Sequence, residues 1–224
     1  MSHTLQAAFL GIVQGLTEFL PVSSTAHLLI SEKLIGFDDP DGVFAVMIQL
    51  GSILAVVWLY RVKILEIVAG LPSKAESRTF ALAIIVAVIP ALVAGGLLSD
   101  FVKGVLYSSF RAIAAAFIVG GLVMGLDRPA AAEFSFFLAI PTMTAAFAHE
   151  LLEVRHHLGP ERAGEIAVGF VMAFLASAAI VKPFVNFVRR SGFAPFAWYR
   201  IVLGIVLLAA LVAGWTLPRG GVAP

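Results

Sequence analysis

The chain has 224 residues, of which 60% are hydrophobic and only 13% are charged, and its mean hydropathy is +1.00. A soluble domain of this length could not bury so much apolar surface, so the composition predicts an integral membrane protein. The net charge of +1 provides no basic face for nucleic acid, and the absence of cysteine excludes disulfides, thiolate nucleophiles and cysteine-based metal sites. The first residues lack a positively charged region, so no removable signal peptide is expected.

Two short apolar runs begin the chain. The first, from Leu5 to Leu20, is short for a membrane span and ends at Pro21 in a polar cluster. The second, from Thr25 to Ile35, is ended by Gly36. Together they predict a re-entrant helical hairpin over residues 1–36, which enters the membrane and returns to the same side.

Six later apolar runs are long enough to cross a bilayer, which takes about 17–25 residues each. These runs are Val43–Tyr60, Thr79–Leu98, Phe110–Leu126, Glu133–His149, Ile166–Val185 and Trp198–Trp215. The fourth is interrupted by Pro141 and Thr142, and the three tryptophans fall at run ends, where an aromatic belt is expected. The sequence thus predicts an all-α polytopic membrane protein, a single domain over 1–224 with a transmembrane bundle over 43–216.

The basic residues of the loops predict an orientation. Seven of them fall on one side of the predicted bundle, namely Arg61, Lys63, Lys74, Arg78, Arg128, Arg189 and Arg190. Four fall on the other side, namely Lys103, Arg155, Arg162 and Arg219. Because cytoplasmic loops carry the excess of Lys and Arg, the first side is predicted to be cytoplasmic.

Two segments within the predicted spans resemble each other weakly. Phe44–Ser52 and Phe134–Thr142 each combine a phenylalanine, an apolar run and a small-residue kink. Their spacing allows an inverted repeat, although a general need for small residues at helix contacts explains them nearly as well.

The polar cluster places reactive groups inside the hairpin. Gln14 and Glu18 are four residues apart, so they share a helix face and Gln14 can orient the Glu18 carboxylate. Ser23 or Ser24 is a natural N-cap for the second helix, on which Ser24 and His27 share a face. Such a group fits a nucleophile, its base and an orienting carboxylate. Alternatively, Glu18 could bind Mg²⁺ or Ca²⁺ that bridges a diphosphate, while the restarted helix offers its N–H groups to an anion.

These residues alone leave three interpretations open. An intramembrane carboxylate in a broken helix is used in catalysis and in transport sites. It can also be a structural hydrogen-bonding group, and a Ser-Ser-Thr run can merely cap a helix.

The stretch Gly15-Leu-Thr-Glu-Phe-Leu-Pro-Val-Ser-Ser-Thr-Ala-His27 resembles the first signature of the undecaprenyl-diphosphate phosphatase family, also called bacitracin-resistance proteins. The likeness continues in Phe44–Ser52, Ala132–Pro141 and Phe193–Arg200. It implies a multi-pass enzyme of the bacterial inner membrane, with six spans and two re-entrant hairpins in an inverted repeat. The implied reaction hydrolyses undecaprenyl diphosphate to undecaprenyl phosphate and phosphate, which recycles the lipid carrier for cell-wall synthesis and confers bacitracin resistance.

The resemblance also implies roles for the residues of the first signature. Glu18, Ser24 and His27 match the catalytic residues: the essential acid, the nucleophile or phosphate ligand, and the proton-transfer group. Glu18 is also the implied ligand of a divalent cation, Mg²⁺ or Ca²⁺. The implied substrate-binding residues are Gln14, Ser23 and Thr25. The implied partners are an isoprenyl diphosphate lipid and membrane lipids, a homodimer is allowed, and the site is expected to face the external, periplasmic side.

One departure from the family pattern affects this site. The second signature, a Pro-Gly-x-Ser-Arg-Ser-Gly loop, is absent, and the chain passes from Gly120–Leu126 directly into Asp127 and Arg128. The second re-entrant hairpin is therefore expected to be missing, together with the arginine that clamps the diphosphate. An alternative function is that of a catalytically impaired lipid-phosphate binder or carrier on the same scaffold.

Further residues of the types that bind metals lie at the end of the fourth predicted span and just after it. They are His149, Glu150, Glu153, His156 and His157. They do not form the His-Glu-x-x-His motif of zinc proteases. They are predicted to form a solvated face in an external loop.

Overall fold

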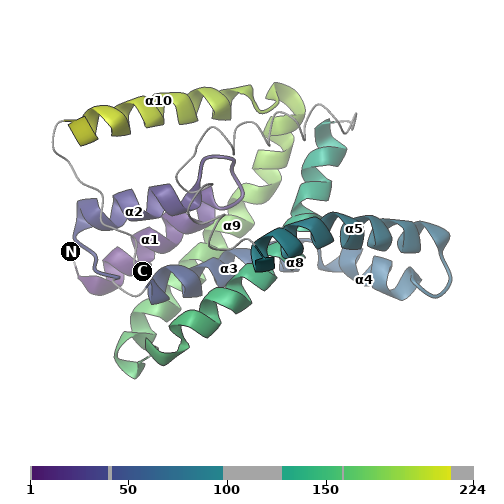
Figure 1. Ribbon diagram of the computed structural model, residues 1–224, viewed down its shortest axis with the longest axis horizontal. Helices are drawn as coiled ribbons and strands as arrows, with labels where there is room; N and C mark the ends of the chain where they lie inside the picture. The colour runs from purple at the N-terminus through teal and green to yellow at the C-terminus, as the bar shows by residue number, and fades with distance from the viewer. Residues whose placement is uncertain (1, 40–41, 98–127, 158, 213–224) are drawn as a thin grey trace. The chain divides into compact units, whose positions relative to one another are not determined.

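The computed structural model describes residues 2–39, 42–97, 128–157 and 159–212, and the regular secondary structure of these residues is entirely helical (Figure 1). The α-helices are α1 (His3–Thr17), α2 (Ser24–Ile35), α3 (Val43–Leu59), α4 (Arg61–Gly70), α5 (Ala75–Leu97), α8 (Arg128–Val154), α9 (Ala163–Ser191) and α10 (Ala194–Val212). Two 3₁₀ turns, η1 (Arg155–His157) and η2 (Pro160–Arg162), connect α8 to α9. The all-α prediction is confirmed for this part of the chain.

Helices cover five of the six predicted spans, and Phe110–Leu126 lies outside the described residues. Pro141 does not end α8, which has 27 residues and continues past Pro141 to Val154. α4 was not predicted at all. By length and composition, one described helical segment, Pro160–Ser191, could cross a membrane. A second candidate membrane span results if α3 and α4 are counted together as one broken span. The six crossings and the inverted repeat stay predictions.

The chain divides into two compact units, one formed by Met1–Arg61 with Ala146–Pro224 and the other by Val62–Ala145. In the second unit, Phe80 of α5 meets the ring of Phe137 of α8 edge-on, with 5.3 Å between centroids. The ammonium group of Lys63 in α4 lies 5.2 Å from the centroid of the same ring. All the residues predicted for the site belong to the first unit. The prediction of a single membrane domain stays a prediction.

A hairpin of two helices, α1 and α2, begins the first unit. α1 ends at Thr17, earlier than predicted, and α2 begins at Ser24. α2 ends at Gly36 as predicted, with a φ of 67° in the left-handed region that glycine adopts without steric cost. The Nε2 group of Gln6 donates to the carbonyl oxygen of Ile35 at 2.7 Å and so closes the open end of the hairpin. Its re-entry from one side of a membrane stays a prediction.

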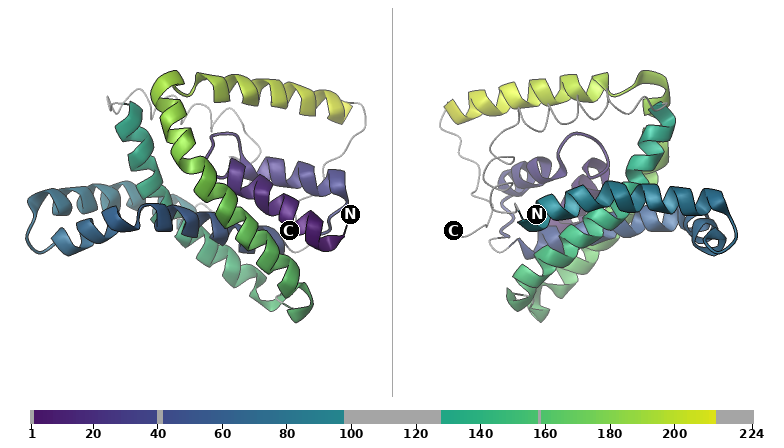
Figure 2. Two further views of the ribbon diagram at one scale, coloured as in Figure 1. Left: turned by 180° about the vertical axis from the view of Figure 1, so that it is seen from behind. Right: turned by 45° about the vertical axis from the view of Figure 1, so that its right-hand side comes forward.

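Small residues bring the backbones of α1 and α9 into direct contact, and the left view of Figure 2 shows the two helices crossing. Gly11 and Gly15 lie four residues apart on α1, facing Gly169, Ala173 and Ser177 at the same spacing on α9. A Cβ atom added at Gly11 would lie 2.2 Å from the carbonyl oxygen of Gly169, and one at Gly15 would lie 2.4 Å from that of Ala173. The hydroxyl of Ser177 donates to the carbonyl oxygen of Gly15 at 3.0 Å. This is the small-residue packing typical of helix pairs in membranes.

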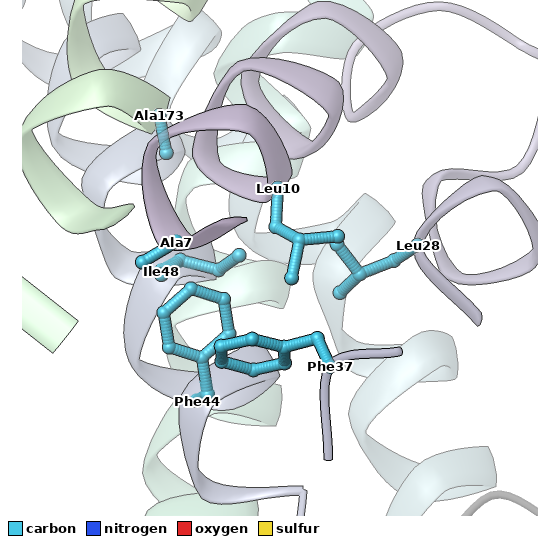
Figure 3. Close-up of a cluster of buried hydrophobic side chains, with 7 residues drawn as sticks. All are labelled: Ala7, Leu10, Leu28, Phe37, Phe44, Ile48 and Ala173. Carbon is cyan, nitrogen blue, oxygen red and sulfur yellow. The ribbon is translucent and has the colours of Figure 1, made fainter. Parts of the chain in front are cut away.

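A buried apolar cluster joins α1, α2, α3 and α9 (Figure 3). Its members are Ala7, Leu10, Leu28, Phe37, Phe44, Ile48 and Ala173. The rings of Phe37 and Phe44 pack at a tilt, with their centroids 4.7 Å apart. α3 approaches α9 at Gly51, where an added Cβ would lie 2.5 Å from the carbonyl oxygen of Phe170. α9 therefore supports both α1 and α3.

We expect the variant Gly11→Ala to be less stable than the parent protein. Its new methyl group would overlap the backbone of Gly169, which cannot move away as a flexible side chain could. Overpacking of this kind costs about 1–3 kcal/mol. The measurement is the melting temperature of the purified protein in detergent. Gly204→Ala in α10 is the matched control, since nothing lies within 4 Å of a Cβ added there. Equal melting temperatures for the two variants would contradict the close approach of α1 and α9.

Candidate active site

The candidate site lies at the break between α1 and α2. Residues 18–23 form the turn there, and it includes Pro21. Ser23 has a φ of 71° and a ψ of 91°, and within the described residues no other non-glycine has a positive φ. Such a backbone costs on the order of 1–3 kcal/mol and tends to occur at functional sites. Ser23 occupies the predicted N-cap position, but its side chain makes no capping hydrogen bond, so a capping role for Ser23 is wrong.

Glu18 is the centre of a hydrogen-bonded cluster at the end of α1. The Nε2 group of Gln14 donates to Oε2 of Glu18 at 2.7 Å, as their four-residue spacing predicts. The side chain of Ser24 lies beside that of Glu18 and interacts with it across the break. Gln14 is only 3% exposed, whereas Glu18 and Ser24 are half-buried. The structure therefore brings three of the predicted site residues together across the break, with the carboxylate held in place by the buried amide.

A second carboxylate, that of Glu150 in α8, interacts electrostatically with Glu18, and its Oε2 atom is buried. The loop predicted at His149 and Glu150 is wrong, because α8 continues through both residues, although His149 is exposed as predicted. The solvent exposure predicted for His156 and His157 is confirmed in η1, and their location outside the membrane stays a prediction. Sequence reasoning missed Glu150 because its partner is far away in the chain and no local motif marks it.

His27 is hydrogen-bonded through both of its ring nitrogens. Nδ1 lies 2.8 Å from the carbonyl oxygen of Ser23, and Nε2 lies 2.5 Å from the hydroxyl oxygen of Tyr199 in α10. The two rings are nearly parallel, at 16°, with their centroids 5.7 Å apart. Within the described part of the chain no hydrogen bond joins Ser24 to His27, and the Ser24 side chain interacts with Glu18. Tyr199 was not predicted for the site, since no sequence pattern pairs α10 with α2.

The N-terminus of α2 completes the site. Its first backbone N–H groups have no carbonyl partner within the helix, and this end of a helix attracts anions. Ser23 and Thr25 are both exposed beside Ser24. Hydroxyl groups, helix N–H groups, a carboxylate cluster and an imidazole together suit the binding and cleavage of a phosphate ester or anhydride.

The donor atoms of the site fit a hard divalent cation in part. Glu18 and Glu150 offer the carboxylate oxygens that Mg²⁺ and Ca²⁺ prefer. The described residues contain no group of three or more acidic or histidine side chains that could hold a metal. Mg²⁺ in particular is usually held by one or two carboxylates together with substrate phosphates, so it does not require a third protein carboxylate.

Comparison with known proteins gives consistent matches over most of the chain. The family model described as "Bacitracin resistance protein BacA" matches residues 7–124 and 114–206. The chain is 40% identical to "Undecaprenyl-diphosphatase 1" of Agrobacterium fabrum, with 93% of this chain and 97% of the relative covered. It is 36% identical to "Undecaprenyl-diphosphatase" of Paracoccus denitrificans, with 96% and 100% covered, and 38% identical to that of Cereibacter sphaeroides, with 96% and 99% covered.

These matches also bear on the missing second signature. The alignment with the Agrobacterium fabrum protein runs over 259 positions, although this chain has 224 residues. The relative therefore contains residues without a counterpart here. The two segments matched by the family model meet at residues 114–124, close to the junction where the signature is absent. Because the family model and the relatives both cover most of its length, this chain belongs to the BacA family of bacitracin resistance proteins.

Proposed function

We propose that this protein is an undecaprenyl-diphosphatase, which hydrolyses undecaprenyl diphosphate to undecaprenyl phosphate and inorganic phosphate. The observation that carries the proposal is the Gln14–Glu18–Ser24 cluster at the N-terminus of α2, in a chain whose relatives bear that name. The reaction would return a lipid carrier to cell-wall synthesis in a bacterial inner membrane. Resistance to bacitracin would follow, in keeping with the name of the family.

The hydrogen bonds of the cluster suggest how the reaction begins. The Ser24 hydroxyl lies beside the Glu18 carboxylate, so Glu18 can accept its proton as the Ser24 oxygen approaches phosphorus. If Ser24 instead binds the phosphate, the same carboxylate orients its hydroxyl. Gln14 keeps Glu18 in place, and His27 serves the proton transfer to or from the other reacting oxygen. A cation held by Glu18 and Glu150 would offset the negative charge of the diphosphate.

We also propose that the open end of the hairpin lies on the external side of the membrane. Arg162 donates to the carboxylate of Asp39 at 2.9 Å and to the carbonyl oxygen of Asp38 at 3.2 Å, which ties this end of the hairpin to the start of α9. The loop charges assign Arg162 to the external side and Arg189 and Arg190, at the other end of α9, to the cytoplasm. α9 has 29 residues, about 44 Å at 1.5 Å per residue, which exceeds the hydrocarbon thickness of about 30 Å.

Cysteine labelling tests this orientation, because the chain contains no cysteine of its own. Asp38→Cys and Ser191→Cys place single thiols at exposed positions beside the two ends of α9. In intact cells, an impermeant maleimide should label the first variant and should label the second only after permeabilisation. The opposite pattern would reverse the orientation.

Substitutions of the proposed catalytic residues should affect catalysis far more than folding. The test uses a version in which the residues of the Agrobacterium fabrum protein that have no counterpart here are inserted between Leu126 and Asp127. In this version we expect Glu18→Gln and His27→Ala each to slow phosphate release by about 10² or more. The assay uses farnesyl diphosphate with Mg²⁺ or Ca²⁺, and melting in detergent should change little. Glu76→Gln and His157→Ala, both at exposed positions, are the matched controls. Near-normal activity of either site variant would remove that residue from the proposed site.

The chain without this segment should be a weak enzyme that still inserts in the membrane. A diphosphate carries several negative charges, and the loss of even one preorganised donor to a developing charge costs roughly 10²–10³ in rate. We therefore expect it to release phosphate slower than the Agrobacterium fabrum protein by at least that factor. Comparable rates would mean that the residues from Gln14 to His27 suffice for catalysis.

A further inference from the structure

The hydrogen bonds of His27 determine where its proton lies. The carbonyl oxygen of Ser23 can only accept, so the Nδ1 atom that faces it must carry a proton. In the neutral imidazole the Nε2 atom is then the acceptor, and the hydroxyl of Tyr199 must donate to it. The hydrogen-bond partners therefore assign the Nδ1–H tautomer to His27.

This assignment directs the basic nitrogen of His27 at Tyr199. Among the described residues, the hydrogen bond at Nε2 is the one to the Tyr199 hydroxyl, and neither Ser24 nor Glu18 is bonded to this nitrogen. A proton that reaches Nε2 in this arrangement must come through the Tyr199 hydroxyl. Tyr199 is 45% exposed, so a substrate or a water molecule can approach it from the side away from His27.

α9 holds Tyr199 at this place through the neighbouring turn of α10. Phe196 precedes Tyr199 by three residues and packs edge-on against Phe184 and Phe187 of α9, with centroid distances of 5.4 and 5.5 Å. Since α9 also packs against α1, one helix supports both sides of the contact between α2 and α10. The hydroxyl is thus placed by packing and not by a flexible loop.

We propose that Tyr199 is a positioning residue and proton relay for His27 in the phosphatase reaction. In the relay, which serves an attacking water molecule and not Ser24, an O–H bond of the water breaks as its proton moves to the Tyr199 oxygen. At the same time the original Tyr199 proton moves to Nε2 of His27. Tyr199 ends neutral and His27 ends positively charged, and the reverse transfer delivers the proton to the departing phosphate oxygen. The inference rests on the proposed function and adds a residue to its site.

The test uses the full chain in detergent, with the ring nitrogens of its histidines labelled with nitrogen-15. The His27 signal, identified by its loss in His27→Ala, should show the Nδ1–H tautomer in the parent protein. Tyr199→Phe keeps the ring and removes the hydroxyl, so a population of the Nε2–H tautomer should appear. Trp198→Phe is the matched control, because Trp198 adjoins Tyr199 and is 68% exposed.

Kinetics with enzyme in excess of farnesyl diphosphate give the second measurement. Tyr199→Phe should slow phosphate release about tenfold or more, with little change in the concentration of enzyme that gives half the maximal rate. The double variant Tyr199→Phe/His27→Ala should be no slower than His27→Ala alone.

Two results would overturn the relay and leave the proposed function standing. One is an Nε2–H tautomer at His27 in the parent protein, which needs no variant to detect. The other is full activity in Tyr199→Phe while His27→Ala is slow. Full activity in both variants would instead remove His27 from the proposed mechanism.

Discussion

The direct contact between the backbones of α1 and α9 is the constraint on which the rest of this unit depends. Gly11 and Gly15 allow α1 to approach Gly169 and Ala173 so closely that no side chain fits between them. The position of α1 sets the position of Glu18 at its end. Because α9 also carries α3 and anchors α10 through Phe196, a shift at this contact would move several sides of the site together.

The contact is formed from small residues, and this suits a membrane environment. Lipid tails are as apolar as leucine, so burying large side chains between helices gains little there. Close packing of backbone atoms and the hydrogen bond from Ser177 to Gly15 provide attraction of another kind. The larger side chains of Leu10, Phe44 and Ile48 instead fill the space beside the crossing.

Local features of the site could be predicted from the sequence, because they depend on the helical period. The Gln14–Glu18 hydrogen bond and the end of α2 at Gly36 are of this kind. The interaction of Ser24 with Glu18 crosses the break, where Ser23 has a positive φ that is uncommon for serine and was not predicted.

Contacts between distant parts of the chain were harder to predict. Tyr199 and Glu150 reach the site only through the packing of helices, so nothing in their own neighbourhood marks them. Gly11 and Gly15 are a different case, because their four-residue spacing is a recognised signal for close helix contact that sequence analysis left unused.

The long separation between α1 and α9 also has a consequence for biosynthesis. Proteins are made from the N-terminus onward, and early segments begin to fold before later ones exist. The glycine face of α1 therefore stays unpacked until the residues of α9, against which it packs, have been synthesised. The hydrogen bond from Tyr199 to His27 can form only after that, when α10 has been added. Of the described helices, the earliest one to be made thus belongs to one of the last contacts to be completed.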